Sequence, residues 1–286
     1  LPSLGDVASD SLPVTDEKRL GDLIMADVRR DPAYLEDAVL QDYIEQLWMP
    51  LVVAARRQGH IGPDLDGSFA WQPFLVRGPS VNAFALPGGH IGVHLGLIAM
   101  TRQPDELASV LAHELTHVTQ RHIARSIESA QKVGPVGLAA MLLGVLVASR
   151  GNIDGAQALI AGGQATVMQG QLNFSRDMER EADRIGFGLM AGAGYSPAAM
   201  ASMFEKLAAA NRLNDSGAFP YLRSHPLTAE RIADARDRAV GQPPVPPAPL
   251  LHQLMAARAQ VLMDATTATL RRWQADGMAR LDEPAL

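Results

Sequence analysis

The chain has 286 residues, no cysteine and a formal net charge of -6 at pH 7, and 47% of its residues are hydrophobic. The missing cysteines exclude disulfides and thiolate metal ligands, and the acidic balance argues against general nucleic-acid binding. A chain of this length with this apolar content is expected to form one large domain and a small appendage.

The N-terminal segment is charged and amphipathic. Residues 1–10 lack both the basic start and the apolar run of a signal peptide. Further along, apolar side chains recur at helical spacing and should cover the core. These are Tyr43, Ile44, Leu47, Trp48, Leu51 and Val52.

Two β-like runs follow, at residues 69–76 and 83–98, with Gly78-Pro79 between them and a Pro87-Gly88-Gly89 turn signal inside the second. Asn82, Ala83 and Phe84 are expected to form a sheet edge that receives an extended substrate peptide as an added strand. A plain edge strand that binds no substrate is the alternative, and the sequence leaves it open.

The most informative stretch is His113-Glu114-Leu115-Thr116-His117, an H-E-x-x-H motif. Neither Pro nor Gly occurs from Asp105 to Gln131, so the motif should lie inside one long helix. Residues four apart share a helical face, so His113 and His117 can bind one ion while Glu114 holds a metal-bound water. Two surface histidines around an ordinary glutamate are disfavoured by the neighbouring apolar positions.

A third ligand must come from His, Asp or Glu. The best segment is residues 175–183, which opens a helix that should close near Gly192 or Gly194. Glu179 and Asp183 are four apart, so one can bind the metal while the other holds a ligand histidine. The remaining acidic residues of this helix start, Asp177 and Glu181, are expected to be solvated.

Four other histidines are candidates for metal binding in principle but are expected to be surface or structural residues: His90, His94, His122 and His252. His122 lies about half a turn off the face that carries His113 and His117, if the helix continues.

Two apolar stretches, residues 133–149 and 156–167, are too short for a bilayer span. They predict a helical hairpin packed on the domain or, alternatively, a mobile apolar flap beside the cleft that contacts unfolded or membrane-bound substrates. The sequence does not separate the two.

The C-terminal part begins with a stiff polyproline linker at residues 241–250. Residues 251–286 then predict at most one helical pair, which must dock or continue into an array in order to bury its apolar face.

Together these motifs resemble those of the M48 peptidases. H-E-L-T-H is followed by E-R-E-A-D at residues 179–183, and the segments 81–90, 118–122, 224–226 and 231–232 match in the same order. Over residues 1–240 the resemblance is to the periplasmic subgroup that enhances β-barrel assembly. It implies a zincin-like α+β domain, mainly helical, with a small sheet beside the active-site helix, followed by a C-terminal helical pair from a truncated tetratricopeptide-repeat region.

The resemblance also implies residue roles. One Zn²⁺ per chain would be bound by His113, His117 and Glu179, with Glu114 and Asp183 as catalytic carboxylates. His225, which precedes Pro226 and should therefore be held outside the α region, would supply a fourth ligand that keeps the enzyme latent. A loop histidine in solvent is the alternative.

The function expected on this basis is a zinc endopeptidase for unfolded or misassembled proteins in outer-membrane quality control. The expected location is the periplasm, with the signal peptide already absent and with contacts to the assembly machinery or the membrane surface. Two alternatives remain: a chaperone for outer-membrane β-barrels that keeps zinc as a structural element, and a zinc hydrolase with a non-peptide substrate.

Overall fold

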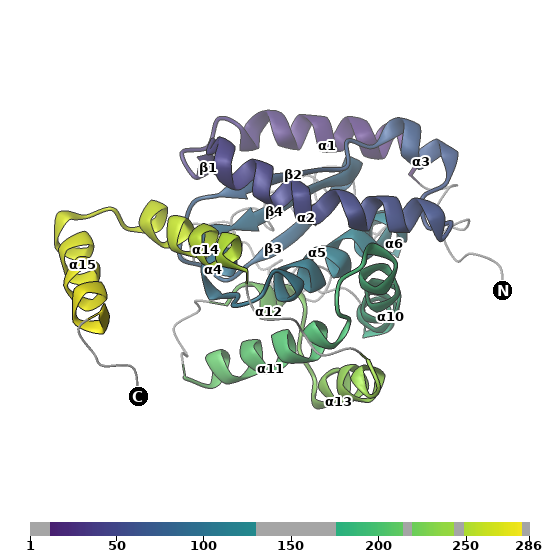
Figure 1. Cartoon of the computed structure of the whole chain (residues 1–286). Coiled ribbons are helices and arrows are strands. Elements are labelled where there is room, and N and C mark those ends of the chain that lie inside the picture. The colour runs from purple at the N-terminus through teal and green to yellow at the C-terminus, as the bar shows by residue number, and fades with distance from the viewer. Residues whose placement is uncertain (1–11, 130–175, 214–218, 243–248, 282–286) are drawn as a thin grey trace, which may run out of the picture.

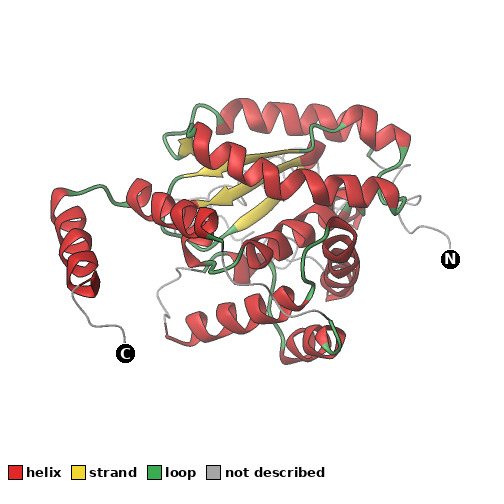
Figure 2. Cartoon of the chain, viewed as in Figure 1, coloured by secondary structure: helices red, strands yellow, loops and turns green. Residues whose placement is uncertain are grey.

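The computed structural model describes residues 12–129, 176–213, 219–242 and 249–281. These residues form a mainly helical α+β domain with one small four-stranded sheet, as expected (Figures 1 and 2). The apolar stretches at residues 133–149 and 156–167 lie outside the described residues, as do residues 243–248 of the proline-rich linker. None of the described helices is both long and apolar enough to cross a membrane.

The sheet has the order β1-β2-β4-β3. Strand β1 (Tyr34–Leu35) pairs antiparallel with β2 (Gln72–Val76), which runs parallel to β4 (His90–His94). Strand β3 (Ala83–Leu86) pairs antiparallel with β4 and forms one edge. A 3₁₀ turn (η2, Pro87–Gly89) joins β3 to β4, and Gly88 and Gly89 adopt the positive φ angles that favour glycine.

The predicted β run was wrong at its end, because residues Leu95–Met100 form helix α4. A short apolar run reads the same in a buried strand and in a buried helix, so periodicity alone could not separate the two. Gly96 lies so close to the preceding loop that an added Cβ would meet the carbonyl oxygen of Pro79 at 2.2 Å. That close approach fixes where the chain turns from sheet to helix.

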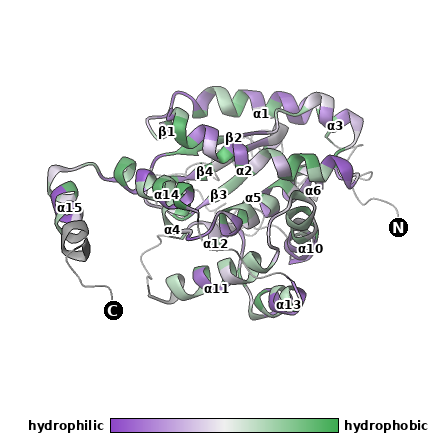
Figure 3. Ribbon diagram, viewed as in Figure 1, coloured by the Kyte–Doolittle hydropathy of each residue, from purple (hydrophilic) through white to green (hydrophobic). Residues whose placement is uncertain are grey.

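Helices cover both faces of the sheet. Helices α2 (Ala38–Arg57), α5 (Pro104–Thr119) and α10 (Arg176–Ala193) share the main core with sheet residues such as Leu75 and Val93. The apolar positions predicted between Tyr43 and Val52 are all buried. Helix α1 (Val14–Val28) covers the opposite face through Ile24 and Met25, and its hydropathy alternates along its length (Figure 3).

The long helix expected around the H-E-x-x-H motif is interrupted. Helix α5 ends at Thr119, Arg121 adopts a left-handed φ of 51°, and α6 (His122–Ser129) begins directly afterwards. Such a backbone costs about 1–2 kcal/mol for a residue other than glycine. It persists because buried Arg121 donates from Nε to Glu17 of α1 at 2.9 Å. The break between α5 and α6 therefore depends on a contact with the distant residue Glu17, which the local sequence pattern does not reveal.

Helices α11, α12 and α13 lie below α5 in the view of Figure 1, and α14 and α15 lie on the left. Helix α10 ends before Gly194, whose φ is 86°, as the glycine signal predicted. The other bounds are α3 (Pro63–Ser68), α11 (Ala198–Leu213), α12 (Tyr221–Ser224), α13 (Ala229–Ala239), α14 (Leu250–Met263) and α15 (Thr267–Leu281).

Helix α14 docks on the body of the domain. His252 is buried and its Nδ1 lies 2.5 Å from the hydroxyl of Tyr43. Arg258 pairs with Asp37, the N-cap residue of α2, at 2.8 Å. The start of the C-terminal helical pair therefore buries part of its surface against α2 and α4 rather than standing free.

Candidate metal centre

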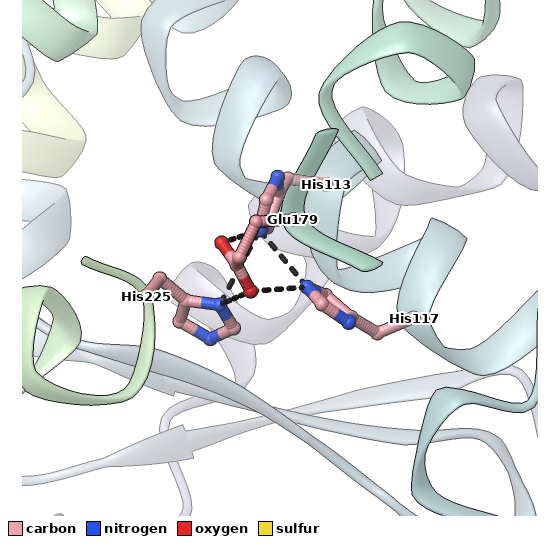
Figure 4. A group of neighbouring side chains, drawn as sticks. All are labelled: His113, His117, Glu179 and His225. Carbon is pink, nitrogen blue, oxygen red and sulfur yellow. Dashed lines mark hydrogen bonds and ion pairs between the residues drawn. The ribbon is translucent and has the colours of Figure 1, made fainter. Parts of the chain in front are cut away.

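Four side chains that could bind a metal ion converge beside α5 (Figure 4). His113 and His117 come from α5, Glu179 from α10, and His225 from the residue after α12. One ligand atom from each lies within 4.8 Å of all the others, and all four residues are buried. Residues separated by more than a hundred positions thus face one point.

Four of the six distances between these donors are close to those around a single tetrahedral ion. His113 Nε2 lies 3.0 Å from His117 Nε2 and 3.3 Å from His225 Nδ1. Glu179 Oε1 lies 3.0 Å from His225 Nδ1 and 3.4 Å from His117 Nε2. Ligands at about 2.0–2.1 Å from a tetrahedral ion are separated by about 3.3 Å. Three imidazoles and one carboxylate are also the donor types that Zn²⁺ accepts.

Glu114 is fully buried beside this group but is not one of its four donors. Its Oε1 lies 3.4 Å from Nε2 of His225, and the backbone N–H of Ala85 in the neighbouring strand β3 also favours its charged form. Burial raises the pKa of Glu114, although the nearby imidazoles of His225 and His113 oppose the shift. A buried carboxylate with so few polar contacts is costly, so its site calls for a further polar partner such as water.

Asp183 holds the outer nitrogen of His113. Its Oδ1 lies 2.9 Å from His113 Nδ1, which leaves Nε2 directed at the other donors. Arg231 donates to both oxygens of Asp183, at 2.7 and 2.8 Å. Burial alone would raise the pKa of Asp183, but the hydrogen bonds from Arg231 and His113 lower it below its usual range. Asp183 is therefore an ionised acceptor.

Arg231 also reaches the ligand group itself. Its Nη1 lies 2.8 Å from Glu179 Oε2 and donates to the carbonyl of Pro226 at 2.9 Å. The pKa of Glu179 would rise through burial, but His225 and His113 hold it well below its usual range. One guanidinium thus links the helix that carries Glu179 to the loop that carries His225.

The backbone of His225 has φ -121° and ψ 77°, outside the α region as its position before Pro226 predicts. Its amide donates to the carbonyl of Tyr221 at 2.8 Å. Tyr221 is a buried residue that the sequence did not single out. Its ring lies 4.8 Å from the His225 ring, and its hydroxyl has no hydrogen-bond partner among the described residues.

Of the two roles expected for His122, the surface role is wrong, because the residue is fully buried and its Nδ1 lies 2.8 Å from Nδ1 of the ligand candidate His117. The expectation for Glu181 needs correction. Glu181 is not a solvated carboxylate: its side chain is 13% exposed and pairs with His122 and Arg125. The hydrogen bond from His122 is the largest contribution that lowers the pKa of Glu181 to about 2. These contacts join α6 to α10, so sequence spacing gave no sign of them.

Three further histidines that the sequence offered as candidates lie outside the group of four donors. His90, His94 and His252 are all buried, so none is a surface residue. His94 packs edge-on against Phe84 at 6.0 Å between ring centroids.

The strand expected to receive substrate is at an edge of the sheet, beside α5 (Figure 1). Asn82 precedes β3, and Ala83 and Phe84 open it. The Asn82 and Phe84 side chains are buried, with Phe84 packed against Phe74. Any substrate contact would therefore involve the backbone of this segment rather than these two side chains.

Comparison with known proteins agrees with this centre. Residues 54–239 match the model of peptidase family M48. The chain is 38% identical over 265 residues to a putative beta-barrel assembly-enhancing protease of Vibrio cholerae, covering 92% of the chain and 52% of that protein. It is 36% identical over 239 residues to the beta-barrel assembly-enhancing protease of Escherichia coli K12, covering 84% and 47%.

A more distant relative is the mitochondrial metalloendopeptidase OMA1 of Saccharomyces cerevisiae, 30% identical over 196 residues, which cover 66% of the chain and 53% of that protein. The chain spans about half the length of each of these three relatives. The resemblance seen in the motifs is confirmed: the chain belongs to peptidase family M48 and carries its metallopeptidase domain.

Proposed function

We propose that the chain is a zinc endopeptidase in which His113, His117 and Glu179 hold one Zn²⁺ and Glu114 is the general base. The observation that carries the proposal is the fully buried carboxylate of Glu114, which lies beside four converging donors and 3.4 Å from Nε2 of His225. A structural metal site has no use for such a group, whereas hydrolysis needs a base within reach of water.

In this proposal zinc supplies Lewis acidity, which polarises the scissile carbonyl and lowers the pKa of the attacking water. Glu114 removes a proton from that water and passes it to the leaving nitrogen. Asp183 accepts a hydrogen bond from His113 and fixes the ring so that Nε2 faces the metal. Because Arg231 and His113 keep Asp183 ionised, it is better suited to orienting than to donating a proton.

His225 makes the resting enzyme latent in this proposal. Its Nδ1 lies with the other donors, so it would complete a closed shell of four ligands and leave no place for water. Turnover would then require the loop after α12 to withdraw. The hydrogen bond from Arg231 to the carbonyl of Pro226 and that from the His225 amide to the carbonyl of Tyr221 both hold the loop in its present position.

We further propose that unfolded or misassembled outer-membrane proteins are the substrates, in the periplasm. The names of the bacterial relatives, which refer to β-barrel assembly, support this substrate class. The edge position of β3 supports binding of an extended chain through backbone hydrogen bonds, which ignore most side-chain identities. We also propose that the chain contacts the outer-membrane assembly machinery or the membrane surface.

The proposed organisation is a peptidase domain at residues 1–240, a linker at residues 241–250 and the start of a tetratricopeptide-like region at residues 251–286. The family match to residues 54–239 supports the first of these. Docking of α14 on α2 and α4 supports a repeat region that begins against the peptidase domain.

A chaperone with a structural zinc site is the second candidate, and the closed group of four donors favours it. The two functions separate in one experiment. The zinc-loaded chain is incubated with a urea-unfolded outer-membrane β-barrel and with the same barrel folded in detergent. We expect cleavage of the unfolded form only. Suppressed aggregation of the intact barrel, with no fragments from wild type or from His225→Ala, would instead establish the chaperone.

A further inference from the structure

A line of polar side chains leads outward from His117, away from the other metal-binding candidates. Nδ1 of His117 lies 2.8 Å from Nδ1 of His122, and Nε2 of His122 lies 3.1 Å from Oε2 of Glu181. Arg125 donates from Nη1 to the same oxygen at 2.9 Å. Both histidines are fully buried, and the Glu181 side chain is 13% exposed.

The direction of every hydrogen bond in this line follows from the role of His117. A neutral imidazole has one N–H and one free lone pair. If Nε2 of His117 binds the metal, its Nδ1 carries the proton and donates to His122. Nδ1 of His122 must then accept, so its Nε2 carries the proton and donates to Glu181. Glu181 accepts from both His122 and Arg125.

The break between α5 and α6 makes this line possible. On a continuous helix, a residue five positions after His117 would point well away from the face that carries its ring. The left-handed backbone of Arg121 redirects the chain so that His122 turns back toward His117. The conformation that interrupts the helix thus delivers His122 to the metal centre.

The two histidines of the motif are supported in parallel ways. His113 is held by Asp183, which Arg231 holds in turn. His117 is held by His122, which Glu181 holds in turn. Glu181 and Asp183 both belong to α10, where they lie two and four residues after Glu179.

We propose that His122 is a positioning residue, which, backed by Glu181 and Arg125, fixes the tautomer and ring orientation of His117 for metal binding. This proposal rests on the proposed zinc site and assigns His122 a role that its place in the sequence did not suggest. Losing an outer partner of a ligand histidine typically weakens metal binding by about 10- to 100-fold.

The test compares two replacements of His122 in the full chain by competition for Zn²⁺ with a chelator. His122→Phe fills the space but accepts no hydrogen bond, so we expect zinc affinity to fall by about 10- to 100-fold. His122→Asn places an acceptor oxygen near the position of Nδ1, so affinity should stay within about threefold of wild type. Equal losses in both variants, or none in either, would overturn the proposal.

A second pair of variants tests the outer end of the line. Glu181→Gln should weaken zinc binding. The neutral amide can still accept a hydrogen bond from His122, but the bond is weaker and the charge that pairs with Arg125 is lost. The control is Asp177→Asn on the same helix, whose side chain is 90% exposed and which should bind zinc like wild type. Equal affinities in Glu181→Gln and Asp177→Asn would count against the role of Glu181.

Nuclear magnetic resonance of the zinc-loaded wild type gives a test that no folding defect can obscure. We expect the ¹⁵N signals of His117 to show the Nδ1–H form and those of His122 the Nε2–H form. An Nδ1–H form at His122 would overturn the proposal. These measurements require no cleavage, so a chain that bound zinc without hydrolysing peptides would defeat the proposed function and leave the role of His122 intact.

Discussion

Asp183 and His113 are joined by a hydrogen bond of 2.9 Å between Oδ1 and Nδ1, at a carboxylate that Arg231 keeps ionised. This contact leaves only Nε2 of His113 for the metal. Asp183→Asn keeps the size of the side chain but removes its charge. In one of its two orientations the new amide turns an NH₂ donor toward the N–H donor of His113, where no hydrogen bond can form. We predict that zinc affinity or turnover falls by about 10- to 100-fold, while the far-UV circular dichroism spectrum is unchanged. An Asp183→Asn enzyme with wild-type affinity and rate would show that this contact does not support the centre.

Glu179 is predicted to be a metal ligand. Glu179→Ala removes the only carboxylate of the four donors, so zinc affinity should fall by more than about 100-fold. Metal analysis after dialysis against a weak chelator measures this directly. Asp177→Ala on the same helix is the control and should keep stoichiometric zinc. Retention of zinc by both variants would remove Glu179 from the ligand set.

His225 is predicted to hold the enzyme latent. If the open form is about 1–10% populated, His225→Ala should raise the initial cleavage rate by about 10- to 100-fold. Quantification of early peptide fragments measures this rate, with Ser224→Ala as a neighbouring control. Unaltered cleavage and unaltered zinc affinity in His225→Ala would contradict the latency proposal.

The buried ion pair between Glu17 and Arg121 is predicted to stabilise the junction of α5 and α6. Glu17→Ala leaves the Arg121 guanidinium buried without its partner, so the free energy of unfolding should fall by about 3–5 kcal/mol. Asp22→Ala breaks a pair with Lys18 on the same helix whose side chains are about half exposed, and should cost less than about 1 kcal/mol. Urea unfolding that gave similar losses for the two variants would argue against a structural role for the buried pair.

Docking of α14 is predicted to depend on pH through Asp37. The hydrogen bond from Arg258 lowers the pKa of Asp37 below its ordinary value of 3.8. Because the folded-state pKa is the lower one, the stabilisation is complete above about pH 3.8 and is lost as pH falls through the folded value.

Asp37→Asn keeps an N-cap acceptor for Leu40 and removes only the charge. The variant should therefore unfold at lower urea than wild type near neutral pH, and the difference should shrink in acid. Arg258→Gln should show the same trend. A difference that does not vary with pH would mean that the charge of Asp37 contributes nothing to docking.

Local helix geometry was enough to predict the ligand spacing of His113 and His117 and the buried face of α2. For the third metal ligand, helix geometry left two candidates, Glu179 and Asp183, because two carboxylates four positions apart share one helical face. The resemblance to the M48 motifs implied that Glu179 is the ligand and Asp183 its support. In the structure Glu179 lies with the histidines, and Asp183 lies behind His113.

What the sequence did not predict depends on contacts between distant residues. The break at Arg121 is set by Glu17, more than a hundred positions earlier. That break carries His122 to His117, and Glu181 is buried only because α6 meets α10 there. Residues 95–98 belong to α4 and not to a strand, because periodicity does not separate a short apolar run in a buried helix from one in a buried strand.

Glu114 is proposed to be the general base of a zinc peptidase. The most direct test is Glu114→Gln, assayed for metal content and for cleavage of an unfolded outer-membrane protein beside wild type. Glutamine keeps the shape of the side chain but cannot take a proton, so we predict stoichiometric zinc together with a loss of cleavage of about 100-fold or more. Undiminished cleavage by a zinc-loaded Glu114→Gln chain would contradict the account.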